Sequence, residues 1–249
     1  LFTLWLVLRR RSRLSADQFE ADEAEAIDAA DPASDTASDA ARRTGNNGAY
    51  SNALEKLVLY YGKKDYWVAH LASLQRKPGF SDRLALDVQR LKLANGLIAK
   101  SDDYMELAQL ALQAGFPVEA RAIVDKGYAS GALGAGDQAA RHQRLKDLVL
   151  KSQADSAANI AQQANDAAAL KDGNDLVKAG TVYASMGQAD KAVDLIEKGI
   201  AKGNLKRPDD AKLRLALAMA GSAKTKANGL AALRTVSGSD GTAEVARLY

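Results

Sequence analysis

From residue 44 onward, apolar and polar positions alternate with the period of amphipathic helices. In stretches such as SDDYMELAQLALQAG (101–115) and NDLVKAGTVYASMG (174–187), apolar residues recur every three or four positions, which is the spacing of one helix face. Short breaks of Gly, Pro or Ser/Asp separate segments of roughly a dozen residues. The pattern predicts an all-α domain over residues 44–249.

Turn residues at the breaks define the ends of the first predicted helices. SNALEKLVLYYGKKDYWVAHLASLQ predicts two helices around a turn at residues 62–65. Pro78 before Gly79 favours a type II turn. Ser81 then caps a helix that stops at Gly96.

Later breaks follow the same logic. Pro117 and Pro208 are each expected to begin a helix. Proline lacks an amide proton, and the amides of the first helical turn have no hydrogen-bond acceptor within the helix. A last, weaker unit covers residues 208–235, and GTAEVARLY (241–249) begins a capping helix.

One phrase of thirteen residues occurs twice. GFPVEARAIVDKG (115–127) returns as GQADKAVDLIEKG (187–199), with the starts 72 residues apart. Both copies keep their first and last glycines, one alanine and one lysine. Gly115 and Gly187 allow a tight turn between two helices. The second helix is expected to cross the first at Ala120 and Ala192.

The register of the two copies extends into the preceding helix. It aligns small residues where two helices cross and larger residues beside the crossing. Gly127 and Gly199 are expected to allow close contact with the neighbouring unit. Placing Tyr60 at the position of Tyr183 in this register also puts Ala69 at the crossing alanine, which predicts a further unit over residues 51–74. The register pairs Leu107, Ala108, Ala111 and Val124 with Ala179, Gly180, Tyr183 and Ile196.

Residues 137–170 form a divergent middle unit. No glycine or proline interrupts residues 137–172, so turn signals are missing there. The segment predicts either two helices or one bent helix, with the break near Ser152–Ser156.

These features resemble the tetratricopeptide repeat, a helix–turn–helix unit of 34 residues. ALEKLVLYYGKKDYWVAHLASLQRKPGFSDRLALDVQRLKLANG, DDYMELAQLALQAGFPVEA and GIAKGNLKRPDDAKLRLALA are similar to the C-terminal half of a group of bacterial tetratricopeptide-repeat proteins. The resemblance covers about residues 45–249. It implies a TPR-like α-solenoid of stacked antiparallel helix hairpins in an exported or envelope-associated, non-enzymatic protein. A periplasmic or inner-membrane-associated location is therefore expected, with a cytoplasmic-facing orientation as the alternative.

The first 43 residues have a different composition. Residues 1–13, LFTLWLVLRRRSR, form an apolar-basic arm. It is either the end of a transmembrane helix, with Trp5 and the arginines at the interface, or a short apolar arm or buried strand. Residues 14–43 form an Ala-rich linker in which residues 14–40 carry nine acids and no base. Such a stretch is a solvated tether or an acidic partner-binding arm.

Composition excludes several classes of function. Apolar residues make up 47% and aromatics only 6% of the chain, which favours helices over a β-sandwich. The absence of cysteine excludes disulfides and thiolate metal sites. Outside the acidic N-terminal region the positive charge is scattered along the predicted helices, so no nucleic-acid partner is expected.

No catalytic constellation is found. His70 and His142 are the only histidines, and neither has a second ligand at metal-binding spacing. Phosphate-loop and nucleophile-elbow motifs are absent from the sequence. Acids at 101–103 and 208–210 are explained by helix capping. We therefore expect no catalytic residue, no metal, no cofactor and no small-molecule substrate.

The predicted fold indicates a protein-binding role. The first helices of stacked hairpins line an inner surface that receives a segment of another protein. The Lys/Asn clamp that grips a peptide carboxyl end is not expected, because Gln109 and Thr181 stand where Asn is needed. The leading hypothesis is a scaffold or adaptor; the alternative is an accessory subunit of a membrane complex, anchored through residues 1–13. The expected partner-binding residues are Tyr61, Gln109, Leu112, Asn174 and Thr181.

Overall fold

The computed structural model describes residue 38, residues 42–43 and residues 47–249. The predicted arm at 1–13 lies outside the described residues, as does nearly all of the predicted linker at 14–43. Every regular element in the described part is helical, which confirms the predicted all-α class there. The helices are α4 (Asn47–Tyr61), α5 (Lys64–Gln75), η2 (Asp82–Leu84), α6 (Ala85–Ala94), α7 (Ser101–Gln113), α8 (Pro117–Ala129), α9 (Ala139–Ala169), α10 (Asn174–Ser185), α11 (Ala189–Lys202), α12 (Pro208–Gly221), α13 (Lys226–Leu233) and α14 (Thr242–Leu248).

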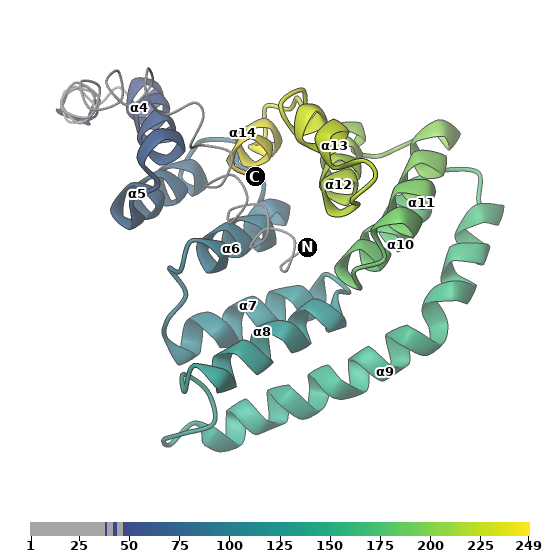
Figure 1. Cartoon of the computed structure of the whole chain (residues 1–249), viewed down its shortest axis with the longest axis horizontal. Coiled ribbons are helices and arrows are strands. Elements are labelled where there is room, and N and C mark those ends of the chain that lie inside the picture. The colour runs from purple at the N-terminus through teal and green to yellow at the C-terminus, as the bar shows by residue number, and fades with distance from the viewer. Residues whose placement is uncertain (1–37, 39–41, 44–46) are drawn as a thin grey trace.

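Consecutive helices pack as hairpins. The pairs α4–α5, α7–α8, α10–α11 and α12–α13 are in contact along their lengths (Figure 1). The predicted helix starts at Pro117 and Pro208 and the predicted turn at residues 62–65 agree with the observed helix ends. Ser81 does precede η2, but its side chain makes no capping hydrogen bond. The local turn chemistry thus sets the hairpins.

The repeated register describes how α7–α8 and α10–α11 pack. Ala108, Ala120 and Ala192 are all completely buried. A methyl group added at Gly180 would lie 2.9 Å from the carbonyl oxygen of Ala192, so the two helix backbones nearly touch at this crossing. The predicted crossing at the alanines is confirmed, and only small residues fit there.

The last glycines of the two copies differ in what they contact. A Cβ at Gly199 would lie 2.8 Å from the carbonyl oxygen of Gly173, which precedes α10, and 2.9 Å from Val177 in α10. Gly199 therefore packs against the start of its own hairpin, and the predicted contact with the neighbouring unit is wrong there. Gly127 faces Tyr104 of its own partner helix and, more closely, Leu133 in the connection to α9.

The first hairpin does not keep the predicted register. Tyr60 is 65% exposed and Ala69 is only half-buried, so neither occupies the crossing. Leu57 and Val58 fill that place in α4 and are buried. The connection between α4 and α5 is shorter than the one between α7 and α8, which shifts the helix faces relative to the turn.

The divergent middle unit is a single helix. α9 runs without interruption through Ser152–Ser156, and Figure 1 shows it curving around the outside of the molecule. Of the two alternatives, the single bent helix is the one observed. Between Val149 and Ile160 no residue of α9 is buried. The helix therefore buries side chains only towards its two ends, and its middle keeps a contact with α8 through Gln153, which accepts a hydrogen bond from Arg121 at 3.2 Å.

The curved stack of hairpins turns back on itself. A second core, separate from the one around α7–α11, joins α5 and α6 to α12 and α14. Polar contacts cross the same junction: Arg247 bonds Glu55 at 2.5 Å, and the Ser81 amide donates to the Asp240 carbonyl at 2.9 Å. The described helices form a ring closed by its first and last elements (Figure 1). This core contains Leu71, Leu74, Leu84, Val88, Leu91, Leu213, Leu217, Val245 and Leu248 among others.

None of the described helices combines the length and the apolar composition that a membrane crossing requires.

His70 lies at the closing junction and predicts a pH effect. It is completely buried, and neither ring nitrogen has a hydrogen-bond partner. Burial lowers the pKa of His70 below its usual value, opposed by Glu55 and Glu244 and assisted by Arg247. Because the unfolded chain takes up this proton first, the stabilising contribution is complete above about pH 6.5 and is lost as pH falls towards the lowered pKa.

We therefore expect the free energy of unfolding to fall as the pH drops below about 6.5, by at most about 1.4 kcal/mol per pH unit. Urea titrations at each pH measure this slope. His70→Gln should flatten it. His142→Gln serves as the control, because His142 is also buried but accepts a hydrogen bond from the Gly134 amide. An unchanged slope in the His70 variant would contradict the assignment.

Candidate functional site

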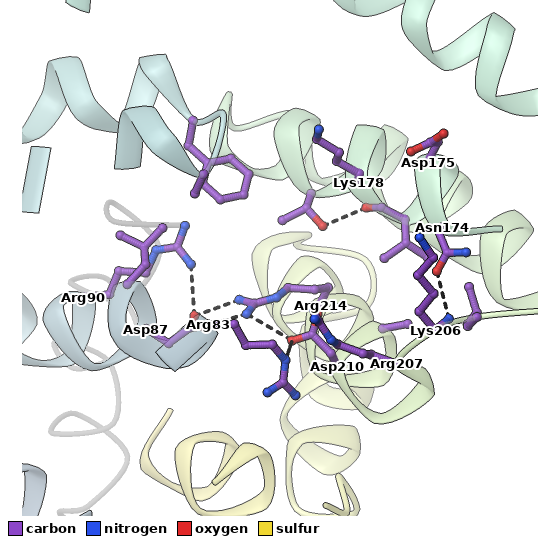
Figure 2. Close-up of a pocket in the computed structure, with 17 residues that line it drawn as sticks. Arg83, Asp87, Arg90, Asn174, Asp175, Lys178, Lys206, Arg207, Asp210 and Arg214 are labelled. Carbon is purple, nitrogen blue, oxygen red and sulfur yellow. Dashed lines mark hydrogen bonds and ion pairs between the residues drawn. The ribbon is translucent and has the colours of Figure 1, made fainter. Parts of the chain in front are cut away.

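A charged pocket of about 430 Å³ lies among α6, α10, α12 and the loop before α12. Its size is in the range of ligand-binding cavities. α10 and α12 are the first helices of their hairpins. Six cationic side chains and three carboxylates line it (Figure 2). The cations are Arg83, Arg90, Lys178, Lys206, Arg207 and Arg214, and the carboxylates are Asp87, Asp175 and Asp210.

Asp87 is the centre of a buried ion network at one wall of the pocket. It is 1% exposed. Arg214, which reaches across from α12 (Figure 2), donates to its two oxygens at 2.8 and 2.6 Å. Arg90 and the Tyr249 hydroxyl donate at 3.0 and 3.1 Å. Burial by itself raises the pKa of Asp87, but Arg214 and Arg90 outweigh it and hold that pKa well below its usual value. Asp87 is therefore a permanent anion.

The two arginines of the network are fully engaged. Arg90 donates to both carboxylate oxygens of Glu119 at 2.6 Å, and its guanidinium lies 5.2 Å from the centre of the Phe116 ring. Arg214 also donates to Asp210 at 3.3 Å. Burial alone lowers the pKa of Arg90, but Glu119 and Asp87 raise it well above its usual value. These charges hold α6, α8 and α12 together.

Three cations at the opposite side of the pocket are differently placed. Lys178, Lys206 and Arg207 are exposed and line the pocket. None of the three charged groups makes a hydrogen bond or an ion pair with another described residue; Lys206 acts on Asp172 only at a longer distance, as one of the weaker contributions to the lowered pKa of that carboxyl. The pocket thus offers positive charge that the described part of the chain does not neutralise.

Two of the five expected partner-binding residues lie in this pocket. Asn174 is half-buried: its amide nitrogen donates to Asp172 at 2.7 Å, and its oxygen accepts from the Lys206 amide at 3.0 Å. Thr181 is buried and donates to the Val177 carbonyl of its own helix at 2.8 Å. Both side chains therefore bond to other parts of the pocket wall and hold it in place. Asn174 in particular ties the loop that carries Lys206 to the start of α10.

The other three expected residues lie elsewhere. Tyr61 packs edge-on against Tyr66, with ring centres 6.4 Å apart. Gln109 is exposed, and Leu112 packs half-buried against the main core. They do not line the charged pocket.

The charged residues of the pocket are the ones that sequence reasoning missed. They come from three separate stretches of the sequence, 83–90, 175–178 and 206–214. One signal was present in the segment LDVQR (86–90), where Asp87 and Arg90 alternate with the apolar residues Leu86 and Val88. All five of its residues are buried, so charges there needed partners inside the molecule.

A second cavity, of about 450 Å³, lies between α4, α5 and α14. Of its three cations, Arg76, Lys77 and Arg247, the last two are already bonded to Glu244 and Glu55. Within the described residues no cluster of three or more His, Asp or Glu side chains is arranged to hold a metal ion. The charged pocket is therefore the stronger candidate for binding.

The chain has no significant match among protein-family models, curated proteins or solved structures.

Proposed function

We propose that this protein is a non-enzymatic scaffold or adaptor that binds a segment of a partner protein on its inner face. The observation that carries the proposal is the charged pocket, in which Lys178, Lys206 and Arg207 line a cavity and form no ion pair with another residue of the described part of the chain. A tetratricopeptide-like origin is part of the proposal. It is supported by the small-residue crossings that α7–α8 and α10–α11 share.

The carboxylates of the pocket support a binding role over an acid/base role. A general acid needs a pKa near the working pH, whereas Arg214 and Arg90 hold the pKa of Asp87 far below it. Asp210 is also engaged, by Arg214. These groups are arranged to stay charged and fixed.

The proposed location is the bacterial cell envelope, on the resemblance described above. The alternative, an accessory subunit of a membrane complex, depends on residues 1–13. The two roles make different demands on the chain: the adaptor recognises its partner through the pocket, and the accessory subunit through its N-terminal arm.

An affinity capture separates these roles. The full chain, immobilised, is offered membrane and soluble fractions of the native cell, beside a version lacking residues 1–43, the pocket variant Lys206→Glu/Arg207→Glu and the control Arg144→Glu/Lys151→Glu. The control places the same charge change on exposed positions of α9. We expect one stoichiometric protein with every bait except the pocket variant. A partner lost only on removal of residues 1–43 would instead identify the accessory subunit.

A further inference from the structure

We propose that the charged pocket recognises an extended acidic segment, whose separate side-chain carboxylates pair with Lys178, Lys206 and Arg207. The inference rests on the proposed function and specifies the chemistry of the partner. It follows from the positions of the three cations, from the carboxylates between them and from the fixed wall behind them.

The three cations are spaced around the pocket. Lys178 extends from α10, and Lys206 and Arg207 come from the loop before α12. In Figure 2, Lys178 lies on a different element from Lys206 and Arg207. A chain that presents carboxylates at intervals along its length matches three cations that come from two separate elements.

The acids of the pocket favour a peptide over a polyphosphate or nucleic acid. Asp175 and Asp210 stand among the cations and would repel a densely charged backbone. Nucleic-acid surfaces are continuous stripes of basic residues, whereas here acids interrupt the bases. An acidic peptide can place neutral residues opposite Asp175 and Asp210.

The remaining wall of the pocket is preorganised. Arg90 and Arg214 are held by Glu119 and Asp87, and the Asn174 amide holds the Lys206 backbone. A rigid site loses less conformational freedom on binding than a mobile one. Only the side chains of Lys178, Lys206 and Arg207 need to become ordered around the peptide.

The test is direct binding to the purified full chain. A fluorescent peptide of alternating Glu and Ala is the probe, the same peptide with Gln for Glu is its neutral match, and pyrophosphate and a short oligodeoxythymidylate are the competing anions. We expect the Glu peptide to bind, the Gln peptide not to bind, and added salt to weaken the complex. We expect neither competitor to displace the peptide at equal concentration.

The variants locate the site. Lys206→Glu/Arg207→Glu should weaken peptide binding about tenfold or more, because opposing charges replace attractive ones. Arg144→Glu/Lys151→Glu changes the net charge equally and should bind as the unaltered protein does. Both pairs are exposed, so thermal unfolding should be unchanged. Equal weakening by both pairs would show a general charge effect and overturn the proposal. Displacement by pyrophosphate or by the oligonucleotide would also overturn it.

The outcome is separable from that of the proposed function. If the captured protein depends on Lys206 and Arg207 but the Glu peptide does not bind, the pocket is a partner site of different chemistry and only this inference fails. If the peptide binds the pocket but no protein is captured, the acidic chemistry stands and the adaptor role fails.

Discussion

Replacing Asp87 by alanine is expected to destabilise the protein by about 3 to 5 kcal/mol, because it leaves buried positive charge without its counterion. Arg214 would lose both short hydrogen bonds of its fork, and Arg90 would keep only Glu119. The Tyr249 hydroxyl would lose its acceptor as well. Because Asp87 joins α6 to α12, its replacement weakens the contact that closes the ring of helices. Urea or guanidinium unfolding measures the change.

Asp210→Ala is the matched control. Asp210 accepts a single hydrogen bond of 3.3 Å from Arg214, and its side chain is 24% exposed, so we expect a loss of less than about 1 kcal/mol. The double variant Asp87→Leu/Arg214→Met should recover much of the loss, because apolar pairs replace buried ion pairs without an unpaired charge. A loss below about 1 kcal/mol for Asp87→Ala would mean that water reaches the arginines.

The Asp87 network should not contribute to the pH effect expected for His70. With its pKa held low by Arg214 and Arg90 against the effect of burial, the Asp87 contribution is complete above the unfolded value of about 3.9. It is lost only as pH falls from there through the lowered pKa. The two groups therefore act in separate pH ranges.

Gly229→Ala is expected to destabilise the protein by about 3 kcal/mol or more, at the upper end of the range for overpacking. An added Cβ would lie 2.2 Å from the amide nitrogen of Ala220 and 2.8 Å from the carbonyl oxygen of Ala216. Both are backbone atoms of α12, so no side-chain rotation relieves the contact. The α12–α13 hairpin would have to separate, and with it part of the second core.

Gly187→Ala separates the clash from the ordinary effect of losing a glycine. Gly187 has a φ of +78°, and nothing lies within 4 Å of an added Cβ. The only cost there is that of placing an alanine in the left-handed backbone conformation, about 1 to 2 kcal/mol. Thermal and chemical unfolding of both variants should rank Gly229→Ala as the more damaging. The reverse order would show that α13 shifts freely on α12.

The local parts of the fold were predictable from the sequence, and the distant contacts were not. Gly115, Pro117 and Pro208 carry their turn chemistry within a few residues, so the hairpin ends could be read directly. The register of α4–α5 was misjudged because Tyr60 was aligned by residue type, although the length of the turn decides which face is buried. Nothing local relates Asp87 to Arg214, since their pairing depends on the whole curvature of the intervening helices.

The residues of the candidate pocket likewise divide into those that the sequence predicted and those that it did not. Asn174 and Thr181 were found because they occupy first-helix positions of a repeat. Lys206 and Arg207 were missed because they belong to a connecting loop, where no periodicity assigns them to a face. The charges of Asp87 and Arg90 in a buried helix indicate that they have partners inside the molecule. That these residues form a wall of the pocket could be recognised only from the closed arrangement of the helices.

Closure also fixes how many hairpins the molecule can hold. In an open stack each unit contacts only its neighbours, so a unit can be inserted or deleted with a local effect. Here one unit more or fewer would move α12 away from α6 and separate Arg214 from Asp87, even though every individual hairpin remained intact. Stability therefore depends on the whole circumference of the described helices, and the number of hairpins between α6 and α12 is constrained by the need of these two helices to meet.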